Sequence, residues 1–277
     1  MSALTIVVVS YNARDDLARC LDSLRAAPPA IAHDIVVVDN ASTDGSAEAA
    51  SARPGVRLIA LPANVGFAAA NNAAIRATSG ELILLLNSDT IVPPGAIDGL
   101  VAALRASSAA AAAGPRLVDA EGRAELSFGD MVTPLTEWRQ KRLLGAADRG
   151  TPGAMATIEE RTRSSRQPDW VSGACLLVRR ADALAVGLLD ERFFLYWEDV
   201  DFCAALRALG YHILFTPDVT VTHLRGRSRA SAAVVTNRRY RDSQLAFYRK
   251  HHPAWAPLLA AYLKLRGQFP DTSKQHR

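Results

Sequence analysis

Apolar runs and helical patterns alternate along the first third of the chain. Four short runs of β-branched and other apolar residues are separated by stretches with helical spacing or helix-permissive composition. Continuous runs of this kind are typical of strands covered on both faces of a sheet, and their alternation with helices predicts βαβ units. The predicted strands are residues 5–10, 34–38, 56–61 and 81–86, with helices predicted around 17–24, 45–51 and 66–78.

The alternation continues beyond residue 89 with one interruption. Between about residues 146 and 169 Gly, Pro, Thr, Ser and Arg predominate, which predicts either a mobile loop near a site or a plain surface insertion. The whole pattern indicates an α/β protein with a mostly parallel central sheet flanked by helices. The remaining predicted elements are a helix over 94–107, a strand over 173–179, a short helix over 181–186, a helix ending near 209, a strand over 211–215 and a basic helical tail from about 230.

Composition and cysteine usage are those of a folded protein with reduced thiols. The chain has 277 residues and 49% hydrophobic content, enough to fill one large core with a small appendage. Its three cysteines lie inside apolar patterns and lack the spacing of a zinc site or a disulfide framework, which predicts a cytoplasmic protein. The apolar run over 4–9 is too short for a signal peptide, and segment 253–265 is shorter than the ~20 residues of a spanning helix.

Basic residues gather after residue 224, although the formal net charge is only +4. Acidic residues in the body offset them and no nucleic-acid module is visible, so we expect no nucleic-acid partner. Together with the apolar segment 253–265, the basic tail predicts either an interfacial helix on anionic lipid at the inner face of the cell membrane, or a helix that packs on its own domain or on the partner in a homodimer.

Two predicted strands end in a carboxylate. Asp39 follows the run 36–38, where it could accept the imide N–H of a uracil or thymine ring, and Asp89 follows the run 84–86. Ligands of an open α/β sheet lie beyond the carboxyl ends of its strands. A carboxylate held there suits a hard cation such as Mg²⁺ or Mn²⁺ bound partly by substrate phosphates, although the segment 87–89 is equally suited to starting a turn.

A third acidic group stands beside bulky aromatic residues in segment 193–201. Such surroundings exclude water and can adjust a carboxylate for general-base catalysis. The same segment also fits a helix N-terminus with acids in its first turn, and the two interpretations are compatible. Trp170 and Trp197, with Tyr196, could stack on a sugar or could belong to the core.

Five segments in order resemble the family 2 glycosyltransferases of the GT-A fold, and the last two resemble the rhamnosyltransferase branch in particular. They are 5–12 (TIVVVSYN), 36–46 (VVVDNASTDGS), 64–72 (NVGFAAANN), 87–89 (NSD) and 197–201 (WEDVD). The resemblance implies one Rossmann-like nucleotide-binding domain over 1–228, with a nucleotide-sugar half (1–107) and an acceptor and catalytic half (108–228). The basic helical tail, 229–277, lies outside it.

The resemblance also implies roles for individual residues. Asp199, with Glu198 beside it, matches the catalytic base, while Asp89 and His223 match positions that hold Mg²⁺ or Mn²⁺. Asn87 replaces the first acidic residue of the family's Asp-x-Asp motif, so the metal has one fewer negative ligand. The positions implied to bind the nucleotide-sugar are Ser10, Tyr11, Asn12, Asp39, Asn40, Asp44, Asn64, Gly66, Asn71, Asn87 and Ser88.

The implied activity is metal-dependent, inverting transfer of a sugar from a dTDP- or UDP-linked donor. The donor expected is dTDP-rhamnose, and the acceptor is a hydroxyl of a glycan or of a lipid-linked saccharide in cell-surface polysaccharide synthesis. The alternatives are a UDP-hexose or galactofuranosyl donor, or a non-catalytic relative that binds nucleotide-sugars or glycans. A dinucleotide-dependent oxidoreductase is excluded, since no Gly-x-Gly-x-x-Gly follows the first strand.

Overall fold

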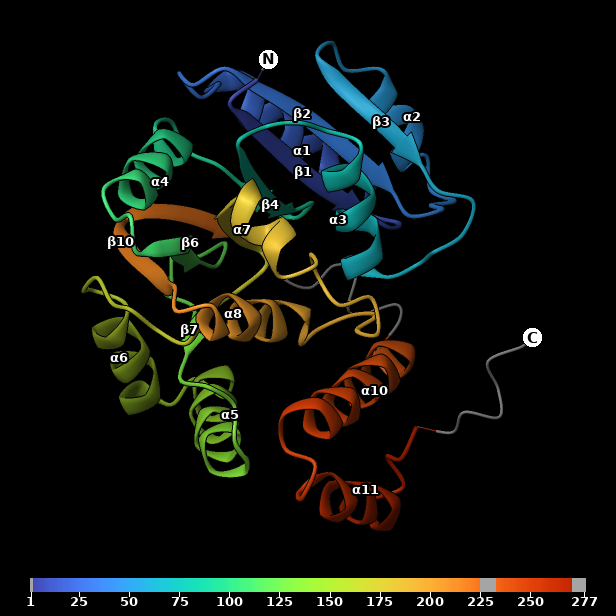
Figure 1. The fold of residues 1–277 in the computed structure, drawn as a ribbon, viewed down its shortest axis with the longest axis vertical. Coiled ribbons are helices and arrows are strands. Elements are labelled where there is room, and N and C mark those ends of the chain that lie inside the picture. Colours follow the sequence, from blue (N-terminus) through green and yellow to red (C-terminus); the bar gives the residue numbers. More distant parts are fainter. Residues whose placement is uncertain (1, 225–232, 271–277) are drawn as a thin grey trace.

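A mixed eight-stranded sheet forms the centre of the computed structural model, which describes residues 2–224 and 233–270 (Figure 1). The strand order is β3-β2-β1-β4-β9-β6-β10-β5, and two further strands, β7 and β8, pair with each other. The strands are β1 (Leu4–Ser10), β2 (His33–Asp39), β3 (Val56–Ala60), β4 (Leu82–Asn87), β5 (Thr90–Ile91), β6 (Ala110–Val118), β7 (Phe128–Gly129), β8 (Trp170–Val171), β9 (Cys175–Arg179) and β10 (His212–His223).

Parallel pairing dominates this sheet, as the sequence predicts. β1 lies parallel to β2 and β4, β2 to β3, and β6 to β10. Only β9, between β4 and β6, and the short β5, beside β10, run antiparallel to their neighbours. All four strands predicted in the first third are present, with ends that differ from the prediction by one residue.

Helices cover both faces of the sheet, and successive residues of β1 point into two separate cores. Ile6 packs with Leu17 of α1 and Leu100 of α4 on one face, while Val7 belongs to the cluster of α3, α8 and α10 on the other. The helices are α1 (Arg14–Ala26), α2 (Ser46–Ser51), α3 (Phe67–Arg76), α4 (Ala96–Arg105), α5 (Pro134–Asp148), α6 (Pro152–Arg161), α7 (Arg180–Ala185), α8 (Glu198–Ala208), α10 (Ala233–His251) and α11 (Ala256–Leu265).

The loop expected over residues 146–169 is in large part helical, so that prediction was wrong. Helix α6 begins at Pro152, whose fixed φ suits the first turn of a helix, and buries Ala154 and Ile158 four residues apart. The Gly, Pro and Thr content favours a loop in any local interpretation. The burial that stabilises α6 depends on contacts with distant segments.

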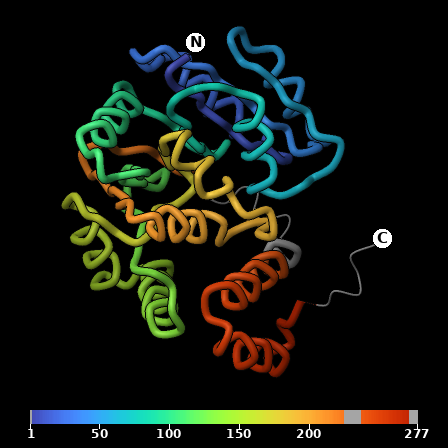
Figure 2. The backbone as a smooth tube through the Cα atoms, in the orientation of Figure 1, coloured from blue at the N-terminus to red at the C-terminus, as the bar shows by residue number. Residues whose placement is uncertain are grey.

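The C-terminal helices pack on the rest of the protein. Phe247 and Tyr248 of α10 belong to the same core cluster as Phe193 and Trp197. Figure 2 shows the chain continuing from α10 into α11 at the end of the molecule opposite the N-terminal strands. The predicted helical tail is therefore confirmed for residues 233–265, while its expected start near 230 lies outside the described residues. Within the described ranges, no helix is both long and apolar enough to cross a membrane.

Candidate active site

The strand ends bring the predicted site residues to one edge of the sheet. Ser10, the last residue of β1, lies beside Asp39, the last residue of β2. On the other side of β1, Val9 lies beside Asn87, which ends β4. Because these three strands are parallel, the segments that follow them leave the sheet at the same edge.

Asp39 has a buried carboxylate that is only half satisfied. Its Oδ2 accepts a hydrogen bond from the Ser42 N–H at 2.9 Å, while its Oδ1 has no partner among the described residues. The neighbouring Ser10 hydroxyl is fully buried and likewise has no partner there. A buried acceptor without a donor costs about 1–3 kcal/mol, so this pair of oxygens is suited to a ligand that supplies an N–H.

The loop after Asp39 is organised by other residues of the predicted nucleotide site. Asn12, at φ +49°, accepts the Thr43 N–H through Oδ1 at 2.8 Å. Asp44 accepts the N–H groups of Arg14 at 2.9 Å and of Ser46 at 3.0 Å. Asn12 and Asp44 thus fix the loop that borders Asp39. The side chain of Tyr11 is half exposed at the same strand end.

A second loop, over residues 64–67, joins this edge to the segment before α8. Asn40 binds it on both sides, accepting the Val65 N–H at 2.9 Å and donating to the Gly66 carbonyl at 3.2 Å. Asn64 accepts the Gly66 N–H at 3.0 Å. Gly66 has φ +89°, and a Cβ there would lie 2.4 Å from the Phe194 carbonyl oxygen, so only glycine permits this approach.

Asn71 lies one turn into the helix that follows this loop. It is fully buried in α3, where its Nδ2 donates to the Phe67 carbonyl at 2.9 Å. Its Oδ1 has no hydrogen-bond partner within residues 2–224 and 233–270. It is a further buried acceptor beside the 64–67 loop.

Asp89 and His223 meet beyond the end of β4. The His223 Nε2 lies 3.3 Å from Asp89 Oδ1 and 3.4 Å from Asn87 Nδ2. Register explains the meeting, because His223 ends β10 opposite Thr90 of β5 and the Leu224 N–H donates to the Asp89 carbonyl at 2.8 Å. Ser88 lies in the turn between Asn87 and Asp89.

Glu125 is a functional candidate that the sequence did not reveal. Its Oε2 lies 3.1 Å from His223 Nδ1, on the ring nitrogen opposite Asp89, and its side chain is buried. Burial lowers the pKa of His223, but hydrogen bonds and charge from Asp89 and Glu125 outweigh it and raise that pKa to about 9. No spacing rule marks Glu125, because it approaches His223 from 98 residues away.

Asp199 and Glu198 occupy the first turn of α8 and differ in their partners. Asp199 accepts two backbone hydrogen bonds, from Gly173 at 2.9 Å and from Val200 at 2.8 Å. Burial raises the pKa of Asp199 in spite of these bonds. Burial and the nearby Asp199 charge raise the pKa of Glu198 well above its usual range, and Glu198 Oε2 has no hydrogen-bond partner in the described part of the chain.

Two backbone hydrogen bonds connect Asp199 to the end of β4, which precedes Asp89. Gly173, which donates to Asp199, precedes Ala174, whose carbonyl accepts the Asn87 N–H at 2.9 Å. A Cβ on Gly173 would lie 3.5 Å from the Phe67 ring at the start of α3. The first turn of α8, the end of β4 and the loop before α3 therefore meet at the edge that also carries Asp39.

The two tryptophans considered as acceptor contacts are core residues in this structure. The Trp170 ring is 9% exposed and its indole N–H donates to the Asp130 carbonyl at 3.0 Å. Trp197 is 6% exposed and packs against the rings of Tyr240 and Phe247. Sugar stacking by either side chain stays a prediction that this burial does not favour.

A cavity of about 720 Å³ opens beside Glu125 instead. The segment 119–126 forms one side of it, and the α5–α6 region forms the other, with Leu144, Met155 and Ile158 among its apolar lining. Carboxylates stand among these apolar groups, including Asp119 and Glu159. Asp119 is paired with Arg123 and Glu159 with Arg116, so the cavity offers charged pairs beside apolar surface, a lining suited to a polar ligand such as a saccharide.

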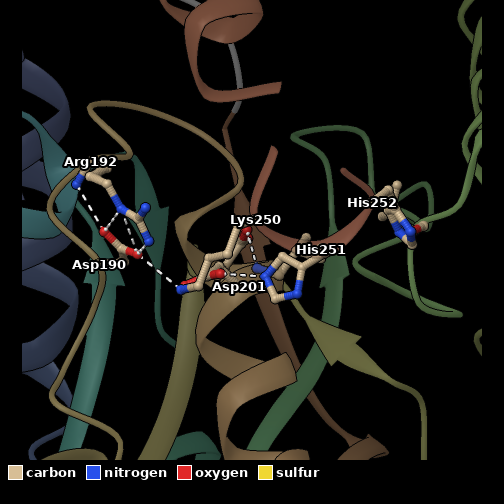
Figure 3. A network of polar contacts seen from close by, with 9 residues as sticks. Asp190, Arg192, Asp201, Lys250, His251 and His252 are labelled. Carbon is tan, nitrogen blue, oxygen red and sulfur yellow. Dashed lines mark hydrogen bonds and ion pairs between the residues drawn. The ribbon is translucent and has the colours of Figure 1, made fainter. Parts of the chain in front are cut away.

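Asp201 has a structural role that its position in the Glu-Asp-Val-Asp segment does not indicate. Figure 3 shows its carboxylate between Lys250 and His251 of α10. Lys250 Nζ lies 2.8 Å from Asp201 Oδ2 and 2.9 Å from Asp190, and His251 Nε2 lies 2.6 Å from Asp201 Oδ1. This cluster, which we call the α8–α10 clamp, holds the helix that carries Asp199.

Replacing Lys250 by methionine is expected to lower the free energy of unfolding by about 1–3 kcal/mol. The buried Asp201 would keep only His251 as a partner, and Lys250 is itself one third exposed, which limits the loss. Thermal or denaturant unfolding measures the change. Arg249→Met, at an exposed position on the same helix, is the control and should shift stability by less than about 0.5 kcal/mol.

Comparisons with known proteins identify the family and the fold of this chain. The sequence pattern described as Glycosyl transferase family 2 matches residues 5–160. An N-acetylglucosaminyl-diphospho-decaprenol L-rhamnosyltransferase of Mycobacterium tuberculosis is 33% identical over 293 positions, which cover 99% of this chain and 94% of that protein. A low-salt glycan biosynthesis hexosyltransferase of Haloferax volcanii is 26% identical and covers 74% of this chain and 61% of its own length.

Solved structures show the same fold. A Pyrobaculum calidifontis mannosyltransferase, solved with GDP-Man and Mn²⁺, superposes with a TM-score of 0.60 at 19% identity and covers 95% of this chain and 70% of its own. GalNAc-T7, solved with UDP, GalNAc and Mn²⁺, superposes with a TM-score of 0.60 at 16% identity. The match covers 98% of this chain and 58% of GalNAc-T7.

These findings define a glycosyltransferase of the GT-A fold. The chain belongs to glycosyltransferase family 2, and its similarity to the mycobacterial enzyme extends over nearly the whole length of both proteins. The resemblance to rhamnosyltransferases expected from the sequence is thereby confirmed.

Proposed function

We propose that this glycosyltransferase moves L-rhamnose from dTDP-rhamnose to a hydroxyl of a lipid-linked saccharide, with inversion at the anomeric carbon and with Mg²⁺ or Mn²⁺. The observation that carries the proposal is the end-to-end similarity to a rhamnosyltransferase whose name specifies a diphospho-decaprenol-linked N-acetylglucosamine. The site supplies a separate group for the nucleoside, for the metal and for the attacking hydroxyl.

The nucleoside is assigned to the Asp39 side of the site. Asp39 Oδ1 and the Ser10 hydroxyl are buried and lack partners in the described structure, and a thymine or uracil imide N–H would pair with the carboxylate. Tyr11, half exposed at the same strand end, offers a ring for stacking on the base.

Replacing Asp39 by alanine is expected to weaken donor binding by about 10–100-fold, since a hydrogen bond to a charged group contributes about 1.5–3 kcal/mol. Calorimetric titration with dTDP and with dTDP-rhamnose measures this loss. Ser51→Ala, at an exposed position of the α2 helix that follows the same loop, is the control, because the Ser51 hydroxyl donates to the Glu48 carbonyl within its own helix. Equal weakening by both substitutions would contradict the assignment of the base to Asp39.

The metal is assigned to Asp89 and His223. Adjacent ligands of an octahedral ion lie ~3 Å apart, and the 3.3 Å between Asp89 Oδ1 and His223 Nε2 fits such a pair. Because Asp89 and Glu125 raise the pKa of His223, metal binding would have to displace the proton on Nε2. Glu125, on the other ring nitrogen, would orient the imidazole for this role. No cluster of three or more His, Cys, Asp or Glu residues arranged for a metal occurs in the described ranges, so diphosphate and water would complete the shell. A bound ion would neutralise charge on the leaving diphosphate.

Asp199 is assigned as the base. Its carboxylate is held by two backbone N–H groups at the N-terminus of α8 and lies at the strand edge shared with Asp39 and Asn87. There it would take the proton of the acceptor hydroxyl as the oxygen attacks the sugar from the face opposite the diphosphate. Burial favours the neutral form of Glu198, which would therefore add little charge beside the base. The cavity beside Glu125 is the proposed place of the acceptor saccharide.

Transfer by the purified protein tests the proposal. The donors are dTDP-rhamnose, a UDP-hexose and UDP-galactofuranose, and the acceptor is a prenyl diphosphate carrying N-acetylglucosamine, with Mg²⁺, Mn²⁺ or chelator. Formation from dTDP-rhamnose of a product whose anomeric configuration is opposite to that of the donor supports it. Transfer from another donor would replace the proposed sugar, and donor binding without transfer or hydrolysis would indicate a non-catalytic relative.

A further inference from the structure

Helix α11 carries apolar side chains on a buried face and on an exposed face. Ala256 and Leu263 are buried, and Leu259 packs against the core cluster that contains Trp197. On the other face lie four large side chains that are at least half exposed. They are Trp255 (51%), Leu258 (61%), Tyr262 (53%) and Leu265 (88%), which we call the α11 stripe.

The spacing of the α11 stripe places all four side chains on one side of the helix, since their intervals are three, four and three residues. A helix that is apolar all round is normally enclosed by protein or by lipid. Scattered exposed apolar residues need no explanation, but a continuous row of this kind marks an interaction surface.

Helix α5 carries two further exposed apolar side chains. Leu135 and Trp138 are both 53% exposed, and the Arg142 guanidinium lies 4.8 Å from the centre of the Trp138 ring. Figure 1 shows α5 and α11 at the same end of the molecule, opposite β3 and the N-terminus. Exposed apolar side chains therefore occur on two helices at this end of the molecule.

The surrounding charge is strongly basic. Residues 233–270 include a single acidic residue, Asp242. On α5, Arg139 and Arg142 are exposed next to Leu135 and Trp138. The Lys and Arg residues of segment 233–270 outside the α8–α10 clamp are Arg238, Arg239, Arg241, Arg249, Lys264 and Arg266.

Exposed aromatic and apolar side chains with basic residues around them fit a lipid surface better than a second copy of the chain. Trp and Tyr have an apolar ring and a polar tip, so they suit the boundary between acyl chains and headgroups, and nearby cations are attracted to anionic lipid. A second copy of the chain packed symmetrically on the α11 stripe would bring two basic surfaces together, which like-charge repulsion opposes.

We infer that the α11 stripe, together with Leu135 and Trp138 of α5, docks on the surface of an anionic lipid bilayer. The functional role of this docking rests on the proposed function, because the membrane would also hold the lipid-linked acceptor. The docking itself depends only on the exposed apolar row and the charge around it.

Vesicle flotation of the full-length protein tests the inference. The probes are vesicles of phosphatidylcholine alone and of equimolar phosphatidylcholine and phosphatidylglycerol, at low and high salt. The variant combines Trp255→Ser, Leu258→Ser and Leu265→Ser, all at exposed positions where folding is little affected. The control combines Leu184→Ser and Leu209→Ser, two leucines that are about half exposed outside α5 and α11.

We expect binding to the anionic vesicles that weakens with salt, a loss on the order of tenfold or more in the triple variant, and wild-type binding by the control. Absence of binding at low salt, or unchanged binding by the triple variant, overturns the inference. So does gel filtration that shows a dimer which the triple variant dissociates, because the stripe would then be covered by a second copy.

Activity separates this inference from the proposed function. With a short-chain, water-soluble acceptor the triple variant should transfer as well as wild type, whereas with an acceptor embedded in anionic vesicles it should be slower. A protein that binds vesicles but transfers no sugar would leave the docking intact and remove the function. If the triple variant and wild type had equal rates on both acceptors, docking would not assist transfer to a membrane-embedded acceptor, and that role of the α11 stripe would be overturned.

Discussion

Replacing Asp199 by asparagine is expected to lower kcat by about 10²–10⁴-fold while donor affinity stays close to wild type. The amide keeps the size of the carboxylate but cannot take the acceptor proton. Steady-state kinetics with saturating donor, together with calorimetric titration of dTDP-rhamnose, measures the two quantities. A variant that also fails to bind the donor would indicate damage to the site and not loss of a base.

The pH profile gives an independent check on the same residue. Burial raises the pKa of Asp199, and the base must be ionised, so kcat/KM of wild type should rise with pH through a value above the ordinary aspartate range. The residual activity of Asp199→Asn should lack this rise. Glu198→Gln is the matched control and should lose far less activity, because burial already favours the neutral form of Glu198.

Replacing Asp89 by asparagine is expected to reduce activity by at least about 100-fold, mainly through weaker binding of the metal and the donor diphosphate. With Asn87 already uncharged, Asp89 is the acidic residue of the 87–89 turn, so its loss leaves this turn without a negative ligand. Donor affinity with Mn²⁺ should fall in the variant, and chelator should bring wild type and variant to the same weak affinity.

Ser88→Ala, in the same turn, controls for local disturbance and should retain the metal effect. If Asp89→Asn and wild type gained equally in donor affinity from Mn²⁺, the assignment of the ion to Asp89 would fail. Magnesium in place of Mn²⁺ should give the same order of effects, since carboxylate ligands suit both ions.

The first third of the fold could be predicted from sequence because its information is local. Each strand there is a continuous apolar run with polar residues at its ends. Asp39 follows such a run directly, and Asp89 follows one after Asn87 and Ser88. Parallel pairing then fixes where the strand ends meet, and the structure brings Ser10, Asp39 and Asn87 to adjacent positions.

The later elements depended on long-range packing and were predicted less well. Strand β10 continues past Pro217 and Asp218 to His223, across a register shift against β6, although Pro and Asp favour a break in any local interpretation. That continuation is what carries His223 to Asp89. Glu125 could not be identified for a similar reason, because its contact with His223 exists only once β10 and the 119–126 segment lie together.

The hydrogen bonds distinguish two kinds of residue among those that the sequence predicted to bind the nucleotide-sugar. Asn12, Asn40 and Asn64 bind backbone groups of the loops at the strand edge, so they hold the loops that border the proposed nucleotide site. Asp39 and Ser10 differ from them by retaining buried oxygens without partners in the described chain. No spacing pattern distinguishes a loop-forming asparagine from a ligand-binding aspartate on the same loop.

The α8–α10 clamp has a consequence for how such enzymes can be recombined. Asp201 is two residues from Asp199, yet its cationic partners come from the last fifth of the chain. Exchanging the C-terminal helices between relatives would therefore transplant half of an ion-pair cluster, and compatible chimeras must inherit matching residues at 190, 201, 250 and 251 together. The C-terminal helices of this chain are therefore not an independent appendage, because they supply the cationic partners of the helix that carries Asp199.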